Sequence, residues 1–379
     1  MDFDYTDDQK ALKDEARRFL ADAAPPSVAR GVLENPERGY DEALWKRIAE
    51  QGWCGAAIPE AYGGHEFGYV ELCALAEELG RSFAPVPFAS SIYQFAEGVL
   101  SAGSEDQKQA LLPAIASGES IGTLALSEGP GTVSAKRLAT RFSGGKLTGE
   151  KLPVIDGMAA DKAIVLALGD AGPVLVIADL TGSGVSREHV STLDPTRGAA
   201  RIVFDGAAAE PLAGGANGMD ALSRILDRSA VLLAFEQLGG ADGALEMARD
   251  YALDRYAFGR PIGSYQAIKH KLADVFIRNE VARVSAYYGA WALSSNAPEL
   301  PVAAAAARIA SCNAYWLASK ENIQTHGGIG FTWEADCHLH YRRAKHLGLV
   351  IGSVKEWKRK LTDRLEAQQG LGAAKGIAA

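Results

Sequence analysis

Two arginines at a predicted helix–turn–helix corner have the chemistry to hold a phosphate-bearing ligand. In residues 251–274 (YALDRYAFGRPIGSYQAIKHKLAD) a helix is predicted to end near Arg255, followed by a sharp turn over 258–263 and a second helix from about Tyr265. Arg255 and Arg260 then place positive charge beside the amide N–H groups of a helix start, where guanidinium groups can contact a diphosphate. A surface loop with two solvated arginines is the alternative, and these residues alone leave both open.

A second stretch, NIQTHGGIGFTWE at residues 322–334, places three glycines within four positions after an alanine-rich helix. Because glycine has no β-carbon, the backbone can approach a ligand closely there. A helix C-terminus followed by an ordinary loop would have the same composition. A single GGxG pattern does not separate the two interpretations.

The histidines and cysteines are not predicted to bind a metal. His338 and His340 are two positions apart and so point to different helix faces, and no carboxylate or cysteine set joins them or His346. We expect these histidines on a solvated helix face. The cysteines lie far apart with no CxxC pair, at Cys54, Cys73, Cys312 and Cys337. They are typical of buried thiols in a reduced cytoplasmic protein.

The elements that position these residues predict an α+β fold, mainly α, in three blocks. Residues 1–120 are predicted to be a helical domain, 121–214 a small β domain, 215–369 a helical bundle and 370–379 a flexible tail. In the first block, Thr6-Asp-Asp-Gln9 has capping-box spacing. Further helices are predicted over about 41–51, 69–80 and 104–117.

The middle and last blocks differ in the period of their apolar residues. Ser143-Gly-Gly145, between the β-rich runs 138–142 and 146–154, predicts a hairpin. Further strands are predicted over 163–168, 174–178 and 201–204, and long helices over about 219–255, 265–294, 302–323 and 335–366. Long helices with wide apolar, alanine-rich faces are typical of a bundle.

The composition excludes several function classes. Of 379 residues, 47% are hydrophobic and 23% charged, and 39 Lys and Arg against 47 Asp and Glu give a net charge of −8. An acidic chain attracts neither nucleic acid nor an anionic membrane surface. No run approaches the roughly 18 apolar residues of a membrane span, and the acidic start MDFDYTDD is unlike a signal peptide. We therefore expect a cytoplasmic protein without nucleic-acid or membrane partners.

Taken together, the two stretches resemble the acyl-CoA dehydrogenase family, as R-x-x-FG-x-PIG-x-x-QA-I-x-H and Q-x-x-GG-x-G-(F/Y). The pattern W-x-G-x-x-IPE-x-YGG at 53–64 and EELG at 77–80 are similar to the family's N-terminal domain. The resemblance thus covers essentially the whole chain. It implies a helical domain, a small β-barrel-like domain and a four-helix bundle, in agreement with the three blocks.

The resemblance also implies FAD as cofactor, α,β-dehydrogenation of an acyl-CoA thioester, and an electron-transfer flavoprotein as acceptor. In the family, a glutamate removes the α-proton while the β-hydrogen leaves as hydride to the flavin. Hydrogen bonds to the thioester carbonyl, one from the glutamate's own backbone N–H, stabilise the enolate. Arg255, Phe258 and Gln266 match positions that contact FAD across a subunit interface, and Gln324, Gly327 and Gly328 match the loop along the adenosine diphosphate.

The catalytic base is missing at the positions that the resemblance indicates. The family's glutamate follows a Y-R-D-A-K motif; here Tyr341-Arg-Arg-Ala-Lys345 is followed by HLGLVIGS, which puts Ile351 at that position. Its side chain cannot accept a proton, although its backbone N–H can still serve the carbonyl. Other members carry the base about 30 residues before the Phe-Gly turn, where this chain has Ser229. Asp227 and Glu236 are the nearest acids, and Glu236, roughly 10 Å along the helix, is expected to pair with a neighbouring helix rather than to act as base.

The β domain departs from the family pattern as well. The T-E-x-x-x-GSD segment that lines flavin and substrate is similar only to Ser127-Glu-Gly-Pro-Gly131, with Thr132-Val133 in place of Ser-Asp. The W-(I/S)-T segment that covers the flavin corresponds to Pro153-Val-Ile155. The half-site for the subunit's own flavin is therefore weakened, whereas Arg255 and Gln266, which would serve a neighbour's flavin, are present. This combination resembles the smaller, base-lacking subunit of α2β2 acyl-CoA dehydrogenases such as those acting on steroid side chains.

Three functions are compatible with these observations. The chain is the β-subunit of a heterotetramer whose paralogous partner supplies the base, a homotetrameric dehydrogenase with Glu236 or Asp227 as relocated base, or a non-enzymatic scaffold of the same fold. The visible spectrum and native mass of the chain expressed alone separate the three. The acyl group and the identity of the partner depend on pocket shape.

Overall fold

The computed structural model describes residues 5–369, which form two compact units. One comprises residues 5–20, 73–83 and 230–369, and the other 21–72 and 84–229. Within the described residues, no helix is both long and apolar enough to cross a bilayer.

The chain begins with helices whose starts follow local sequence signals. The Thr6 N–H donates to Gln9 Oε1 (2.9 Å) and the Gln9 N–H to Thr6 Oγ1 (3.3 Å), which confirms the predicted capping box. A buried segment of π-helix, η4, was not predicted. The helices are α1 (Asp7–Ala23), α2 (Pro26–Glu34), α3 (Glu42–Glu50), α4 (Tyr69–Arg81), η4 (Ala89–Ala96), α5 (Glu97–Ala102) and α6 (Glu105–Ala116).

The strands close into a small barrel. Neighbours around the ring are β4, β2, β3, β7 and β5, and β5 pairs with β4 again; β1 joins β4 in parallel and β6 joins β7. The predicted hairpin of β2 and β3 is confirmed, with Gly144 and Gly145 at positive φ in its turn. The strands are β1 (Gly122–Ala125), β2 (Arg141–Ser143), β3 (Lys146–Ile155), β4 (Lys162–Gly169), β5 (Gly172–Asp179), β6 (Val185–His189) and β7 (Ala199–Pro211).

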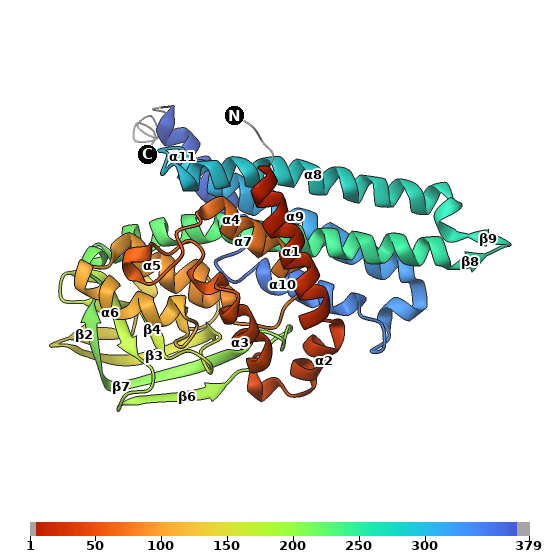
Figure 1. The fold of residues 1–379 in the computed structure, drawn as a ribbon. Helices are drawn as coiled ribbons and strands as arrows, with labels where there is room; N and C mark the ends of the chain where they lie inside the picture. Colours follow the sequence, from red (N-terminus) through yellow and green to blue (C-terminus); the bar gives the residue numbers. More distant parts are fainter. Residues whose placement is uncertain (1–4, 370–379) are drawn as a thin grey trace, which may run out of the picture. The chain divides into compact units, whose positions relative to one another are not determined.

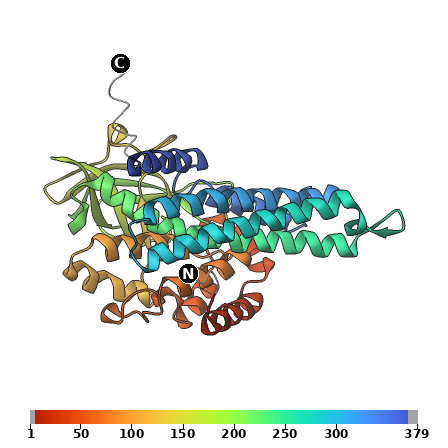
Figure 2. The same ribbon diagram turned by 90° about the horizontal axis from the view of Figure 1, so that it is seen from above.

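The last part of the chain is a bundle in which α7, α8 and α9 run side by side (Figures 1 and 2). Alanines line their contacts and let the axes approach closely. The elements are α7 (Gly218–Asp254), β8 (Tyr256–Ala257), β9 (Arg260–Pro261), α8 (Gln266–Ser294), α9 (Leu300–His326), η8 (Gly327–Phe331), α10 (Cys337–Leu347) and α11 (Val354–Gln368). The predicted mainly α fold with a small barrel and a bundle is confirmed.

One predicted helix is wrong. Residues 335–366 form two helices, α10 and α11, separated by a turn over 348–353. Gly352 in this turn has φ of 103°, and Ser353 and Glu356 form a capping box that starts a new helix. The predicted tail, 370–379, lies outside the described residues. The domain boundaries near residues 120 and 214 stay a prediction.

A buried ionic network ties α1 and α4 to the bundle. Glu77 of α4 accepts contacts from Lys13 Nζ (2.7 Å) and Arg283 Nη1 (2.6 Å). Arg283 also pairs with Asp242 of α7, whose other oxygen accepts from Asn279 (3.0 Å). Charged groups in such a site are stable only when they are paired, so the network fixes α1 on the helices that carry the predicted ligand corner.

Candidate functional site

The predicted diphosphate corner is the hairpin of β8 and β9, which joins α7 to α8 (Figure 1). Phe258 and Gly259 form its tip, both at positive φ, and the Phe258 side chain is 98% exposed. Gln266, the first residue of α8, is also exposed. The hairpin thus leaves the side chains of Phe258 and Gln266 exposed on the surface of this chain.

Of the two arginines at this corner, Arg255 is the one left free for a ligand. The guanidinium of Arg260 lies 4.0 Å from the centroid of the Tyr265 ring, which holds it on its own hairpin. Arg255 is exposed, and within residues 5–369 no hydrogen bond or ion pair holds its guanidinium. A planar group with five donors is therefore ready to bind an anion there.

The local structure requires glycine at two of the three positions after α9, Gly327 and Gly330, and for different reasons. A β-carbon at Gly330 would lie 2.5 Å from Ile323 O, and Gly327 has φ of 65° with ψ of −135°, which only glycine adopts readily. Gly328 is required by neither, since a β-carbon there would meet nothing within 4 Å. Exposed backbone beside open space is compatible with the close approach of a ligand, which stays a prediction.

The two stretches are brought together by a ring stack. Tyr251, one turn before Arg255, stacks on His326 at the end of α9, with ring centroids 4.1 Å apart. His326 is followed directly by Gly327, so the arginine corner and the glycine loop flank the same pair of rings. Positive charge, exposed amides and open backbone fit the adenosine diphosphate part of FAD.

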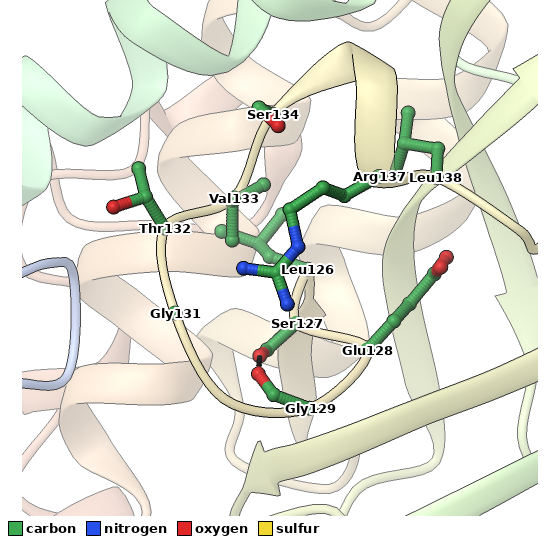
Figure 3. Close-up of a pocket in the computed structure, with 10 residues that line it drawn as sticks. All are labelled: Leu126, Ser127, Glu128, Gly129, Gly131, Thr132, Val133, Ser134, Arg137 and Leu138. Carbon is green, nitrogen blue, oxygen red and sulfur yellow. Dashed lines mark hydrogen bonds between the residues drawn. The ribbon is translucent and has the colours of Figure 1, made fainter.

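The β-domain half-site does not fit a flavin in the same way. The loop after β1 closes on itself, because Arg137 Nη2 donates to Pro130 O (2.5 Å) across it. Figure 3 shows the Arg137 side chain reaching into this loop. Glu128 fixes the start of this loop, because its carboxylate accepts hydrogen bonds from Lys151 Nζ (2.7 Å) and the Ala139 N–H (2.6 Å). The cavity left inside is about 30 Å³, room for a water molecule rather than for a ring system.

The segment expected to cover the flavin has no aromatic ring or hydroxyl. In β3, Val154 is fully buried while Pro153 and Ile155 alternate to the other side. Neither side chain can donate a hydrogen bond, and neither offers a planar surface. The described geometry therefore supports half of a flavin site at the α7–α8 corner and none at this strand.

Ile351, at the predicted base position, lies in the turn between α10 and α11. The turn is ordered by Trp357, whose indole N–H donates to Ile351 O (3.1 Å), and by the Ser353–Glu356 capping box. Ile351 is 5% exposed and carries no titratable group. The turn at the predicted base position is therefore ordered, but the side chain of Ile351 cannot accept a proton.

The candidate bases on α7 have other environments. The Ser229 hydroxyl lies 2.6 Å from Tyr93 O, a carbonyl of the π-helix, and is fully buried. Asp227 is buried too. Glu236 is buried beside Arg343, with Oε1 to Nη1 at 3.8 Å. This ion pair is the neighbouring-helix contact that the sequence favoured for Glu236.

The prediction of a solvated histidine face is wrong for His340. Its ring is fully buried, with Nδ1 3.2 Å from the Tyr315 hydroxyl, and burial lowers the pKa of His340 to about 3. Among residues 5–369, no three His, Cys, Asp or Glu side chains gather in a way that could hold a metal ion.

Two residues that order the Ile351 turn were missed from the sequence. Arg308 follows an alanine run in α9 and is fully buried; a lone cation in such an apolar segment is the signal that could have marked it. Trp357 belongs to α11, whose start carries the S-x-x-E signature at 353–356. Reading that signature would have separated α10 from α11.

Comparison with known proteins agrees with the predicted resemblance. Residues 6–119 match the family described as acyl-CoA dehydrogenase, N-terminal domain, and residues 216–355 match acyl-CoA dehydrogenase, C-terminal domain. The acyl-CoA dehydrogenase IpdE2 of Mycobacterium tuberculosis is 32% identical over 94% of this chain and 96% of its own length.

Solved structures show the same fold. A variant of the Tcur3481–Tcur3483 steroid ACAD is 31% identical, covers 96% of this chain and 99% of its own, and has a TM-score of 0.87. The ChsE4–ChsE5 complex from Mycobacterium tuberculosis is 26% identical with the same coverage and a TM-score of 0.85. The chain belongs to the acyl-CoA dehydrogenase family of oxidoreductases acting on CH–CH bonds.

Proposed function

We propose that this chain is the base-lacking subunit of a heteromeric, FAD-dependent acyl-CoA dehydrogenase whose paralogous partner subunit supplies the proton-accepting carboxylate. The observation that carries the proposal is Ile351, an apolar side chain at the position of the family's base, in a turn that is otherwise ordered. Ser229, at the other family position, has its hydroxyl beside a backbone carbonyl. A dehydrogenation that needs an α-proton removed must take its base from elsewhere.

The residues that hold FAD in this proposal lie at the α7–α8 corner and after α9. Arg255 pairs with the diphosphate, Gln266 and Phe258 contact the cofactor of a neighbouring subunit, and the backbone at Gly327 and Gly328 lies along its adenosine diphosphate, near Gln324. Bound there, FAD would supply the hydride acceptor that dehydrogenation of the acyl group needs. This chain's part is to bind and orient the cofactor through fixed charge and exposed amides.

The closed loop at Arg137 and the apolar Pro153 and Ile155 support an asymmetric complex. A flavin covered by this chain's own β domain lacks the aromatic contact and the hydroxyl donor, which are worth about 0.5–1.5 kcal/mol each. Flavin then binds where the partner subunit's β domain covers it and this chain's Arg255 corner clamps it. We expect two FAD per α2β2 tetramer.

An exposed apolar row on α8 supports association with another subunit. Phe276, Ile277, Val281 and Val284 fall on one side of the helix and are all more than half exposed. The relatives include a two-component complex and a structure described as a steroid ACAD, which favours a heteromer acting on a bulky acyl-CoA. A neighbour described as an electron transferring flavoprotein supports that class of acceptor. Four free, buried cysteines support a reducing, cytoplasmic setting.

Co-expression tests the proposal. The chain is purified alone and together with a paralogous acyl-CoA dehydrogenase that carries the base glutamate, and native mass, flavin content and acyl-CoA turnover are measured for both. We expect turnover and bound FAD only in the complex. A yellow homotetramer of this chain with one FAD per subunit and full turnover would favour a relocated base, Glu236 or Asp227, and a flavin-free complex without turnover would favour the scaffold.

A further inference from the structure

The segment that joins α7 to α8 has no core of its own. Ala252 is the last buried residue of α7 and Val275 is the first buried residue of α8, and none of residues 253–274 between them is buried. This segment, the arm, contains the β8–β9 hairpin and the first turns of α8, and it forms the free end of the helix pair in Figures 1 and 2. A segment that buries no side chain gains little hydrophobic stabilisation.

Few interactions join the arm to other elements. Its own contacts are internal: the Tyr265 hydroxyl donates to Ala257 O (2.9 Å), and the Arg260 guanidinium lies on the Tyr265 ring. Besides the backbone bonds of α7 and α8, one hydrogen-bond, ion-pair or ring contact links the arm to another part of residues 5–369. It is the ion pair between Lys271 Nζ and Glu321 Oε2 of α9, at 3.6 Å. A partly exposed pair of this kind shifts an equilibrium by about twofold to fivefold.

The Glu321 carboxylate is placed for this pair. Its side chain is 12% exposed, and Oε2 is buried and accepts no hydrogen bond within the described chain. The other oxygen, Oε1, lies 3.2 Å from Nζ of Lys320, the preceding residue of the same helix. Because a buried carboxylate oxygen is costly without a partner, Lys271 and Glu321 act as a weak latch between the arm and α9.

The surface of the arm suits an anionic partner with apolar contacts. Leu253, Tyr256 and Phe258 are each more than half exposed, and the exposed apolar row of α8 continues from them at Phe276. The arm is positively charged in a chain whose net charge is −8. Its cationic residues are Arg255, Arg260, Lys269 and Lys271, and its acidic residues are Asp254 and Asp274.

We propose that the arm opens by local unfolding in the isolated chain and becomes ordered when it closes over a FAD-bearing partner subunit, with Lys271 and Glu321 as its latch. This inference rests on the proposed function, which supplies that partner. Flavin capture is then coupled to assembly, because part of the free energy of the new contacts is used to order the arm. The isolated chain holds FAD poorly although Arg255 and Gln266 are present.

Hydrogen exchange tests the arm on the full chain, alone at several protein concentrations and in the co-expressed complex. The amides of residues 269–274 are compared with those of residues 304–318 in α9, since both sets belong to helices. In the chain alone we expect protection below about 100-fold in the arm and above about 10⁴-fold in α9. In the complex, protection of the arm should rise at least about tenfold.

Two lysine variants test the latch. Lys271→Met removes the ion pair of the arm and should make its amides exchange about twofold to fivefold faster. Lys320→Met is the matched control, because Lys320 pairs with the same carboxylate but lies on α9 itself. It should leave exchange of the arm unchanged. Both lysine side chains are about half exposed, so both variants should fold.

Three results would overturn the inference: an arm as protected as α9 at every concentration of the chain alone, exchange of the arm that is unchanged in the complex, or equal effects of the two lysine variants. Failure of the proposed function has another signature. Protection of the arm that falls on dilution of the chain alone would show that it closes over a second copy of this chain, which supports the arm but refutes the heteromeric function.

Discussion

Replacing Glu236 by glutamine tests whether its carboxylate stabilises the fold or acts as a relocated catalytic base. Glu236 lies on α7, is 4% exposed, and its Oε1 is 3.8 Å from Nη1 of Arg343, which is equally buried. Arg343 also donates to Phe83 O (3.1 Å). If the role of Glu236 is to balance this cation, its loss affects stability and leaves the reaction almost unchanged.

The expected magnitude follows from the distance and the burial. Unit charges 3.8 Å apart interact by about 4 kcal/mol at an effective dielectric constant of about 20. Removing one partner of a buried pair costs about 3–5 kcal/mol, because the remaining charge loses its counter-ion in a poorly solvated site. The gap is longer than a direct charge-assisted hydrogen bond. We therefore expect Glu236→Gln to lower the free energy of unfolding by about 3 kcal/mol, the lower end of this range.

Two assays on the reconstituted complex report the two roles. Urea denaturation gives the loss of stability, and steady-state turnover per bound FAD gives the effect on catalysis. Glu246→Gln is the matched control: Glu246 is on the same helix and pairs with Arg81 at 2.6 Å, but its side chain is 45% exposed, so its loss should cost at most about 1 kcal/mol. Turnover of Glu236→Gln should stay within a few-fold of the wild type.

A fall in turnover of about 10²–10⁴-fold with flavin still bound, the size of a lost general base, would refute this reasoning and assign catalysis to Glu236. Asp227→Asn tests the other acid of α7 with the same two assays. A wild-type denaturation midpoint in Glu236→Gln would refute the ion-pair role instead. Glu236→Leu combined with Arg343→Met should recover part of the lost stability, since apolar pairs replace buried ion pairs well.

Three further predictions concern the cofactor corner and the pH dependence of stability. Arg255→Ala should weaken FAD retention by about 1.5–3 kcal/mol, seen as a lower flavin-to-protein ratio after gel filtration. Arg249→Ala should not, because Arg249 is an exposed arginine in the last two turns of α7 that pairs with its neighbour Asp250; an equal loss in both variants would contradict the assignment. Burial lowers the pKa of His340 from 6.5 to about 3, so between these pH values the unfolded chain binds one proton more than the folded chain. The free energy of unfolding should therefore fall by about 1.4 kcal/mol per pH unit as pH decreases. In His340→Gln the urea midpoint should lose this dependence on pH. Burial raises the pKa of Glu77, but the ammonium of Lys13 and the guanidinium of Arg283 outweigh burial and hold this pKa below 4.5. The contribution of Glu77 to stability is therefore present above pH 4.5 and lost on acidification. Glu77→Gln should be less stable at pH 7 and should show a weaker pH dependence of the free energy of unfolding below pH 4.5; an unchanged pH dependence there would count against the network.

Features set by neighbouring residues were predictable from the sequence. The capping box at Thr6 and Gln9, the Gly144-Gly145 hairpin and the start of α8 at Gln266 each depend on a few consecutive residues, and the structure confirms them. The family could be recognised because its ligand-contacting residues lie in short, ordered stretches around Arg255 and Gly327. The absence of a carboxylate at 351 is likewise a property of the sequence alone.

Only the tertiary structure decided which charges are buried and what they contact. Arg308 reaches Gln237 and the end of α10, and Glu236 faces Arg343, across 39 to 107 positions of sequence. Such pairings depend on how helices pack, and hydrophobic periodicity leaves the partner of a buried cation undefined. The break at 348–353 was missed for a related reason, since α10 and α11 continue one apolar pattern on either side of it. The turn around Ile351 is likewise held by contacts from Arg308 of α9 and Trp357 of α11, which only the folded bundle creates.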